Sequence, residues 1–140
     1  MVTDVFKKYS DYGLVSLRIG LGVVFLLHGI GKLLAVGPFA AGISGTAGFF
    51  TNVGIPAAML FAWIVALVET FGGLAILGGF QTRLASLLVA VDMLVAFLVV
   101  HISNGFNVAN GGGELVWVLF FGAVTLMLLG PGKKWSVDKN

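Results

Sequence analysis

Four long apolar stretches constrain this chain more than any other feature of its sequence. They cover residues 14–36, 57–78, 83–102 and 114–130. A helix needs roughly 17–25 mainly apolar residues to cross a bilayer, and the fourth stretch lies at the short limit of that range. Only 10% of the 140 residues are charged, against about 25% in a soluble domain. We therefore predict an all-α membrane protein with one domain over residues 1–140, built as a bundle of four transmembrane helices.

Glycine and proline mark the ends of these stretches. Pro56 precedes the second stretch, Gly78 and Gly79 close it, and Pro131 follows the fourth. Proline is tolerated in the first turn of a helix, and glycine is common just after the last turn. The connection from Gly79 to Thr82 is short, so the second and third helices should be antiparallel neighbours. The pattern predicts an up-down-up-down bundle.

Lysine and arginine are divided unevenly between the two ends of that bundle. Lys32 approaches one end, and the end with both termini holds Lys7, Lys8, Arg83, Lys133, Lys134 and Lys139. Basic residues are in excess on the cytoplasmic side of membrane proteins. Both termini are therefore expected in the cytoplasm, with 131–140 as a cytoplasmic tail. Residues 1–12 place Val2, Val5, Phe6 and Tyr9 at helical spacing, which predicts a cytoplasmic amphipathic segment.

Two loops are predicted at the opposite end. Residues 37–56 carry no charge, many glycines and three phenylalanines, Phe39, Phe49 and Phe50. This composition predicts a short interfacial segment between the first two spans, with a helix near 46–53. Residues 103–113 are polar and rich in glycine. Each loop is either a flexible connector or a lid over the mouth of the bundle.

Ionisable side chains occur inside the predicted spans, where each costs a few kcal/mol and normally faces the bundle interior with a partner. They are Arg18, His28, Lys32, Glu69 and Asp92, with His101 and Glu114 at the outer mouth. At 100° per residue, the three groups of the first span share a stripe with Gly22 and Gly29. Glu69 shares the small-residue face of the second span. Asp92 should point inward, and His101 lies half a turn away from it.

The depths of these groups predict a polar track that descends from the outer mouth. Its order is Glu114, His101 and Lys32, then His28, then Glu69 and Asp92. Arg18 can reach up toward Glu69 or down to lipid phosphates. One interpretation is structural, with Arg18–Glu69 and Lys32–Glu114 ion pairs that fix helix register. The other is functional, because an imidazole between a lysine and a midplane carboxyl suits proton-coupled chemistry.

Several classes of protein are excluded or disfavoured. The chain has no cysteine, which excludes thiol–disulfide exchange and iron–sulfur ligation by cysteine. His28 and His101 differ in depth by roughly 10 Å on helices that run the same way, so a bis-histidine haem is not expected. A metal site is only weakly indicated, because no pair of candidate ligands has the helical spacing of three or four residues. No glycine-rich motif follows a strand, so no nucleotide-binding loop is predicted. The net charge of +2 is too small to indicate a nucleic-acid partner.

The chain resembles the DoxX family of small bacterial membrane proteins. The resemblance rests on six blocks, LRIGLGVVFLLHGIGK (17–32), GFFTNVGIP (48–56), ALVETFGG (66–73), TRL (82–84), HISNGF (101–106) and GGE (112–114). It implies a four-helix bundle in the bacterial cytoplasmic membrane. Named members are linked to quinone-coupled oxidation, such as the membrane subunits of thiosulfate:quinone oxidoreductase, and to oxidative-stress complexes.

Three functions stay open at this point. The first is a quinone-linked redox subunit that receives electrons from a soluble or membrane redox partner. Its candidate catalytic residues are His28, Lys32, Glu69 and Asp92, and its candidate quinone-binding residues are Arg18, His28, Lys32, Glu69, His101, Asn104 and Glu114. Phe25, Phe71 and Phe97 either line a slot for the ring or belong to ordinary core packing. The second function is a non-catalytic membrane anchor or assembly partner, including a homo-oligomer. The third is a pathway for protons or small solutes.

Overall fold

The computed structural model describes the backbone of residues 2–138 and the side chains of residues 4–138, so Lys139 and the side chain of Val2 lie outside the described residues. Every regular element in the described part is helical. The long apolar helices are α2 (Gly13–Leu34), α4 (Ala58–Gly78), α5 (Thr82–Ala96) and α6 (Glu114–Leu129). Beyond α5 the chain continues as a π-helical turn, η2 (Phe97–His101), and a 3₁₀ turn, η3 (Ile102–Asn104).

Three helical stretches in the described residues are long and apolar enough to cross a membrane. They are Ser10–Leu34, Ala58–Gly78 and Thr82–Asn104. Helix α6 is a shorter apolar helix of 16 residues. The remaining elements are α1 (Val2–Lys8), η1 (Ser10–Tyr12), α3 (Gly42–Asn52) and η4 (Val108–Asn110). Helix α3 starts earlier than the sequence predicts and occupies the uncharged loop between α2 and α4.

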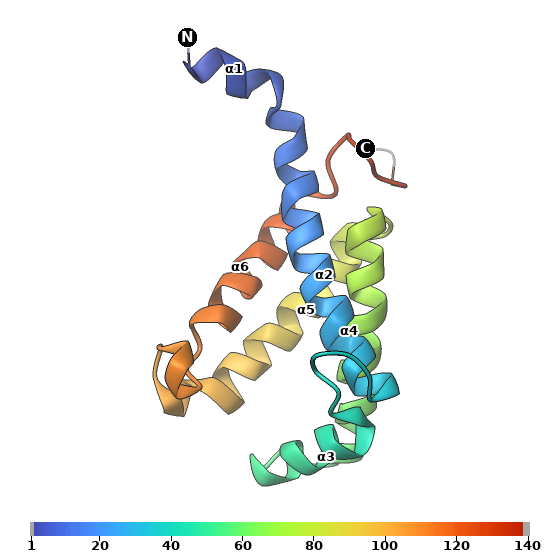
Figure 1. Cartoon of the computed structure of the whole chain (residues 1–140), viewed down its shortest axis with the longest axis vertical. Coiled ribbons are helices and arrows are strands. Elements are labelled where there is room, and N and C mark those ends of the chain that lie inside the picture. The colour runs from blue at the N-terminus through green and yellow to red at the C-terminus, as the bar shows by residue number, and fades with distance from the viewer. Residues whose placement is uncertain (1, 139–140) are drawn as a thin grey trace.

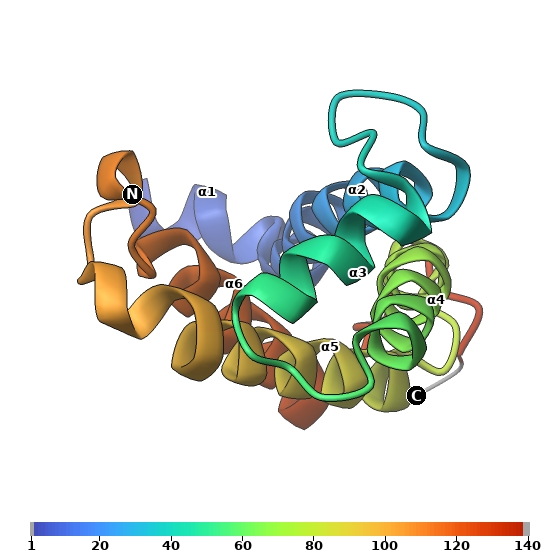
Figure 2. The ribbon, with the colours of Figure 1, turned by 90° about the horizontal axis from the view of Figure 1, so that it is seen from below.

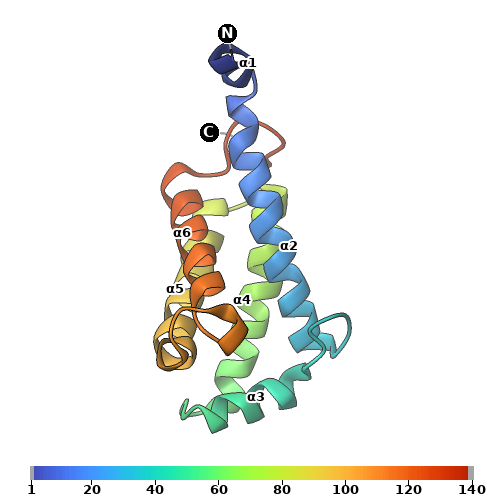
Figure 3. The ribbon, with the colours of Figure 1, turned by 60° about the vertical axis from the view of Figure 1, so that its left-hand side comes forward.

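The long helices form two pairs. Helix α2 packs most extensively on α4, and α5 on α6, whereas α2 and α6 touch over a smaller surface. Consecutive long helices run in opposite directions, and both termini lie at one end of the molecule (Figure 1). The two pairs diverge toward the other end, where α3 lies across the bundle (Figures 2 and 3). Ala47 and Phe50 of α3 pack against Ala62 of α4, and this contact holds α3 on α4.

Glycine brings the backbones of α2 and α4 into contact. A Cβ atom at Gly73 of α4 would lie 2.6 Å from the backbone nitrogen of Leu26 and 3.0 Å from the carbonyl oxygen of Gly22. A Cβ atom at Gly29 would lie 2.7 Å from the Cα atom of Thr70. No side chain fits at these positions, because real Cβ atoms do not approach backbone so closely. The prediction that Gly22 and Gly29 face a closely packed neighbour is confirmed.

The larger hydrophobic core joins α2, α4, α5 and α6 and extends into the end of the bundle nearest the termini. Ile76, Val89 and Leu126 come from α4, α5 and α6 and are fully buried. Leu21 and Phe25 of α2 belong to the same cluster. Packed side chains therefore close the bundle toward the termini, and the diverging helices leave space toward α3.

Candidate functional site

A cavity of about 410 Å³ lies between the two helix pairs, on the side of α3. Small-molecule sites in proteins usually measure about 300–1,000 Å³ and have mainly apolar walls with a few polar groups. Phe25 of α2, Val65 of α4 and Met93 of α5 contribute apolar wall. Phe49 and Phe50 of α3 cover the cavity from the outer end. Its size and lining are those of a binding site for a small apolar molecule.

Five of the ionisable residues singled out from the sequence line this cavity: His28, Lys32, Glu69, Asp92 and His101. They belong to α2, α4 and the continuous stretch of α5 and η2. Residues up to 73 positions apart in the chain thus share one space. Asn104 and Glu114 are not part of the lining. Asn104 instead donates a hydrogen bond to the Gly111 carbonyl at 3.4 Å, and Glu114 is the first residue of α6.

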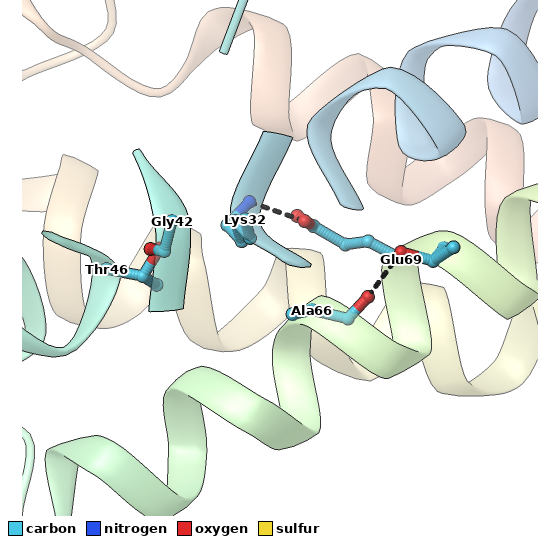
Figure 4. A network of polar contacts seen from close by, with 6 residues as sticks. Lys32, Gly42, Thr46, Ala66 and Glu69 are labelled. Atoms are coloured by element: carbon cyan, nitrogen blue, oxygen red, sulfur yellow. Dashed lines mark hydrogen bonds and ion pairs between the residues drawn. The ribbon is translucent and has the colours of Figure 1, made fainter. Parts of the chain in front are cut away.

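Lys32 and Glu69 form an ion pair across the α2–α4 contact. The Nζ atom of Lys32 donates to Oε2 of Glu69 (Figure 4), and both side chains are largely buried, with exposures of 17% and 6%. The structural interpretation predicted the ion pairs Arg18–Glu69 and Lys32–Glu114, and this prediction is wrong. Lys32 meets Glu69 because its four-carbon side chain extends away from the end of α2 and places the ammonium group inside the bundle. The close helix contact brings Glu69 within range.

Arg18 lies at the opposite end of the bundle from the cavity. Its guanidinium group donates five hydrogen bonds of 2.6–3.3 Å, two to the last turn of α4 and three to the C-terminal tail; the acceptors are the carbonyl oxygens of Ile76, Leu77, Pro131, Lys134 and Trp135. A guanidinium has five N–H groups, so none remains for Glu69. The last carbonyls of a helix have no partner within it, and a cation there is favourable. The structure thus separates Arg18 from the candidate site and gives it a structural role.

His101 reaches the cavity because the end of its helix is not α-helical. A regular helix would place it half a turn from Asp92. In η2 the helix takes more residues per turn, which changes the direction of His101. Its Nδ1 atom lies 2.7 Å from the Gly111 carbonyl oxygen. A carbonyl only accepts hydrogen bonds, so Nδ1 carries the proton and Nε2 of the neutral ring is an acceptor.

Of the three phenylalanines that the sequence offered as a slot for the ring, one lines the cavity. Phe25 lines the cavity, but Phe71 is 61% exposed on the outer surface of α4 and does not line it. Phe97 packs on Trp117, with ring centroids 5.1 Å apart. His28 stacks on Phe39, with centroids 3.7 Å apart and an angle of 16° between the planes. Helical periodicity could not find this stack or the lining residues of α3, because loop conformation decides both.

Comparison with known proteins places these features in a wider group. The family model DoxX matches residues 13–102. The chain is 33% identical over 137 residues to the inner membrane protein YqjF of Escherichia coli, covering 95% of each chain. It is 29% identical over 124 residues to a Bacillus subtilis protein named "Putative oxidoreductase CatD", covering 89% of this chain and 84% of the relative. No solved structure matches.

Proposed function

This chain belongs to the DoxX family of membrane proteins, and we propose that it is a quinone-linked redox subunit of the bacterial cytoplasmic membrane. The observation that carries the proposal is the cavity, in which apolar walls surround His28, the Lys32–Glu69 pair and Asp92. One relative has a name that describes an oxidoreductase, and another is named an inner membrane protein. These names favour redox chemistry in that membrane.

The residues of the cavity fit a quinone. A quinone offers a flat apolar ring, an apolar tail and two carbonyl oxygens, and when bound it supplies a two-electron, two-proton acceptor. Phe25, Phe49 and Phe50 provide apolar surface for the ring. His28 can donate a hydrogen bond to a ring oxygen, and a carboxyl group in the cavity can carry protons. The electrons come from a soluble or membrane redox partner in this proposal.

We further propose that α6 is the fourth membrane span, which completes an up-down-up-down bundle with both termini in the cytoplasm. Its 16 apolar residues and its packing along α5 support this topology. The segments that adjoin the terminal end of the bundle contain four lysines, Lys7, Lys8, Lys133 and Lys134. Because basic residues concentrate on the cytoplasmic side, this end faces the cytoplasm and the cavity faces the other side.

A non-catalytic anchor is the second candidate. A shallow groove runs between α2 and α6, lined by Ser16 and Gly20 on one side and Gly122 and Thr125 on the other. Small residues of this kind allow close helix docking in membranes. A proton or solute pathway is disfavoured, since fully buried Ile76, Val89 and Leu126 separate the cavity from the terminal end.

Binding of a short-tailed quinone to the full chain in lipid nanodiscs tests the proposal. We expect decylubiquinone to bind, and Phe49→Ala to weaken binding about fivefold, because a ring contact contributes roughly 1 kcal/mol. Phe71→Ala is the matched control, since Phe71 lies outside the cavity. In membranes, His28→Ala and Glu69→Gln should slow quinone reduction. Absence of binding, or equal affinity and rates in all variants, would rule the function out.

A further inference from the structure

The ionisable residues of the cavity fall into two groups. Lys32 and Glu69 are bonded to each other and largely buried. Removing the charge from one member of a buried pair leaves the other charge without a partner, at a cost of several kcal/mol. The pair is therefore stable as a fixed pair of charges. It is poorly suited to exchange protons with a ligand in every reaction cycle.

Asp92 is in a different situation. It lines the same cavity from α5, and in the described residues no hydrogen-bond donor reaches its buried Oδ2 atom. A buried polar atom without a partner is uncommon in proteins and calls for an explanation such as a functional role. Because no ion pair or hydrogen bond in the described part holds this carboxyl group, it can gain or lose a proton without breaking such a contact.

Other ionisable groups near Asp92 come from three elements. They are His28 and Lys32 of α2, Glu69 of α4, and His101 of η2. Helix α3 covers the cavity and has no ionisable residue. Helix α6 begins with Glu114, which does not line the cavity. Lys32 is already paired with Glu69, so the groups that can take up or release protons beside Asp92 are the two imidazoles.

His101 is the imidazole nearer the polar loop. Its Nδ1–H is held by the Gly111 carbonyl, which leaves Nε2 to take up a proton and release it. The side chain is partly exposed at the end of η2. Asp92 and His101 are nine residues apart, about 13 Å along a helix that rises roughly 1.5 Å per residue. Water beside the ionisable groups of this cavity of about 410 Å³ can bridge such a distance.

We propose that Asp92 is the catalytic carboxyl group that exchanges protons with a bound quinone, and that His101 passes these protons between the cavity and its polar mouth. This inference rests on the proposed function. The redox partner supplies two electrons to the ring. Asp92 breaks its own O–H bond, gives that proton to a ring oxygen and becomes a carboxylate. His101 then returns a proton from the polar mouth to Asp92 through cavity water. Asp92 gives this second proton to the other ring oxygen, which completes the two-proton reduction and leaves Asp92 as a carboxylate.

The test uses the full chain in nanodiscs, decylubiquinone as the probe and an electrode as the electron donor, coupled through a mediator that carries electrons without protons. Proton uptake is followed with a pH indicator dye, and infrared difference spectra between the oxidised and reduced probe report carboxyl groups that change protonation. Asp92→Asn preserves side-chain size, so we expect binding within about twofold of the original chain. Proton uptake should slow about 100-fold, as expected for loss of a general acid, and the carboxyl band should vanish. Asp92→Glu should restore both.

Two controls separate this role from a structural one. The double variant Lys32→Met/Glu69→Gln removes the fixed pair and should keep the carboxyl band. Asp11→Asn changes an exposed aspartate at the terminal end and should leave every readout unchanged. His101→Gln should slow proton uptake while the band stays. Unchanged proton uptake or a persistent band in Asp92→Asn would overturn the proposal. Failure of the original chain to bind the probe would instead contradict the proposed function, and this inference with it.

Discussion

Two basic side chains of α2 show how residue chemistry decides their use. Arg18 and Lys32 were predicted on the same stripe, and both find partners on α4. The planar guanidinium of Arg18 has several N–H groups in fixed directions, and these match a cluster of backbone carbonyls. Lys32 has one compact ammonium group on a flexible stem, which matches the single carboxylate of Glu69. Arginine therefore serves as a structural clamp and lysine as the partner of a site residue.

Breaking the Lys32–Glu69 pair from one side should be costly. Glu69→Gln leaves the Lys32 ammonium buried without a counter-charge, and the expected loss is about 3 kcal/mol of unfolding free energy. Lys32→Met/Glu69→Gln should recover a large part of that loss, because no charge is left in the interior. Thermal unfolding in detergent compares the variants. A double variant less stable than Glu69→Gln would show that the pair itself, rather than the unpaired charge, controls stability.

At the scale of the helices, the contact of α2 with α4 fixes the geometry of the site. Close approach at Gly22, Gly29 and Gly73 brings the two backbones together and carries Glu69 within reach of Lys32. Helix association in membranes depends on such close packing, since lipid tails are as apolar as the side chains. The geometry of the site thus depends on three glycines in the contact between α2 and α4.

Adding one methyl group to this contact tests its importance. Gly73→Ala should destabilise the fold by about 1–3 kcal/mol, because its Cβ atom would overlap the α2 backbone. Gly20→Ala is the matched control on α2, at the groove that faces α6, where no atom lies within 4 Å of the added Cβ. That change should be neutral or stabilising, as alanine favours helix more than glycine. Unfolding midpoints measured in one detergent decide the comparison, and equal effects of the two substitutions would contradict it.

The whole molecule has two unlike ends. At the terminal end the tail is tied down: the carboxylate of Asp138 accepts hydrogen bonds from the backbone N–H groups of Gln81 and Thr82 at 3.0 and 3.1 Å, and Arg18 binds tail carbonyls. These contacts cap the start of α5 and the end of α4. At the other end the helix pairs diverge (Figure 1) and α3 lies across them (Figure 3). Residues of α3 line the cavity there. The fold is closed at one end and hollow at the other.

The absence of cysteine makes the proposed topology directly testable. Lys7→Cys reports the terminal end, and Asn107→Cys reports the polar loop at the cavity end. In intact cells with a permeable outer envelope, a membrane-impermeant maleimide should label Asn107→Cys and spare Lys7→Cys. Disrupting the membrane should then expose both positions. Labelling of Lys7→Cys in intact cells would reverse the orientation, and labelling of both would contradict a common side for the termini and a separate side for the cavity.

The sequence alone determined the long apolar helices and five of the candidate site residues, because apolar length and buried charge are local properties of a helix. His28, Lys32, Glu69 and Asp92 were all found in this way, and all line one cavity. Only the tertiary structure decided their partners. The partner of a long side chain depends on the distance between helices, as in the Lys32–Glu69 pair. It also depends on irregular turns, such as the π-helical turn that ends at His101. Periodicity assumes regular helices and gives neither the distance between them nor the fold of a loop such as the one that places α3.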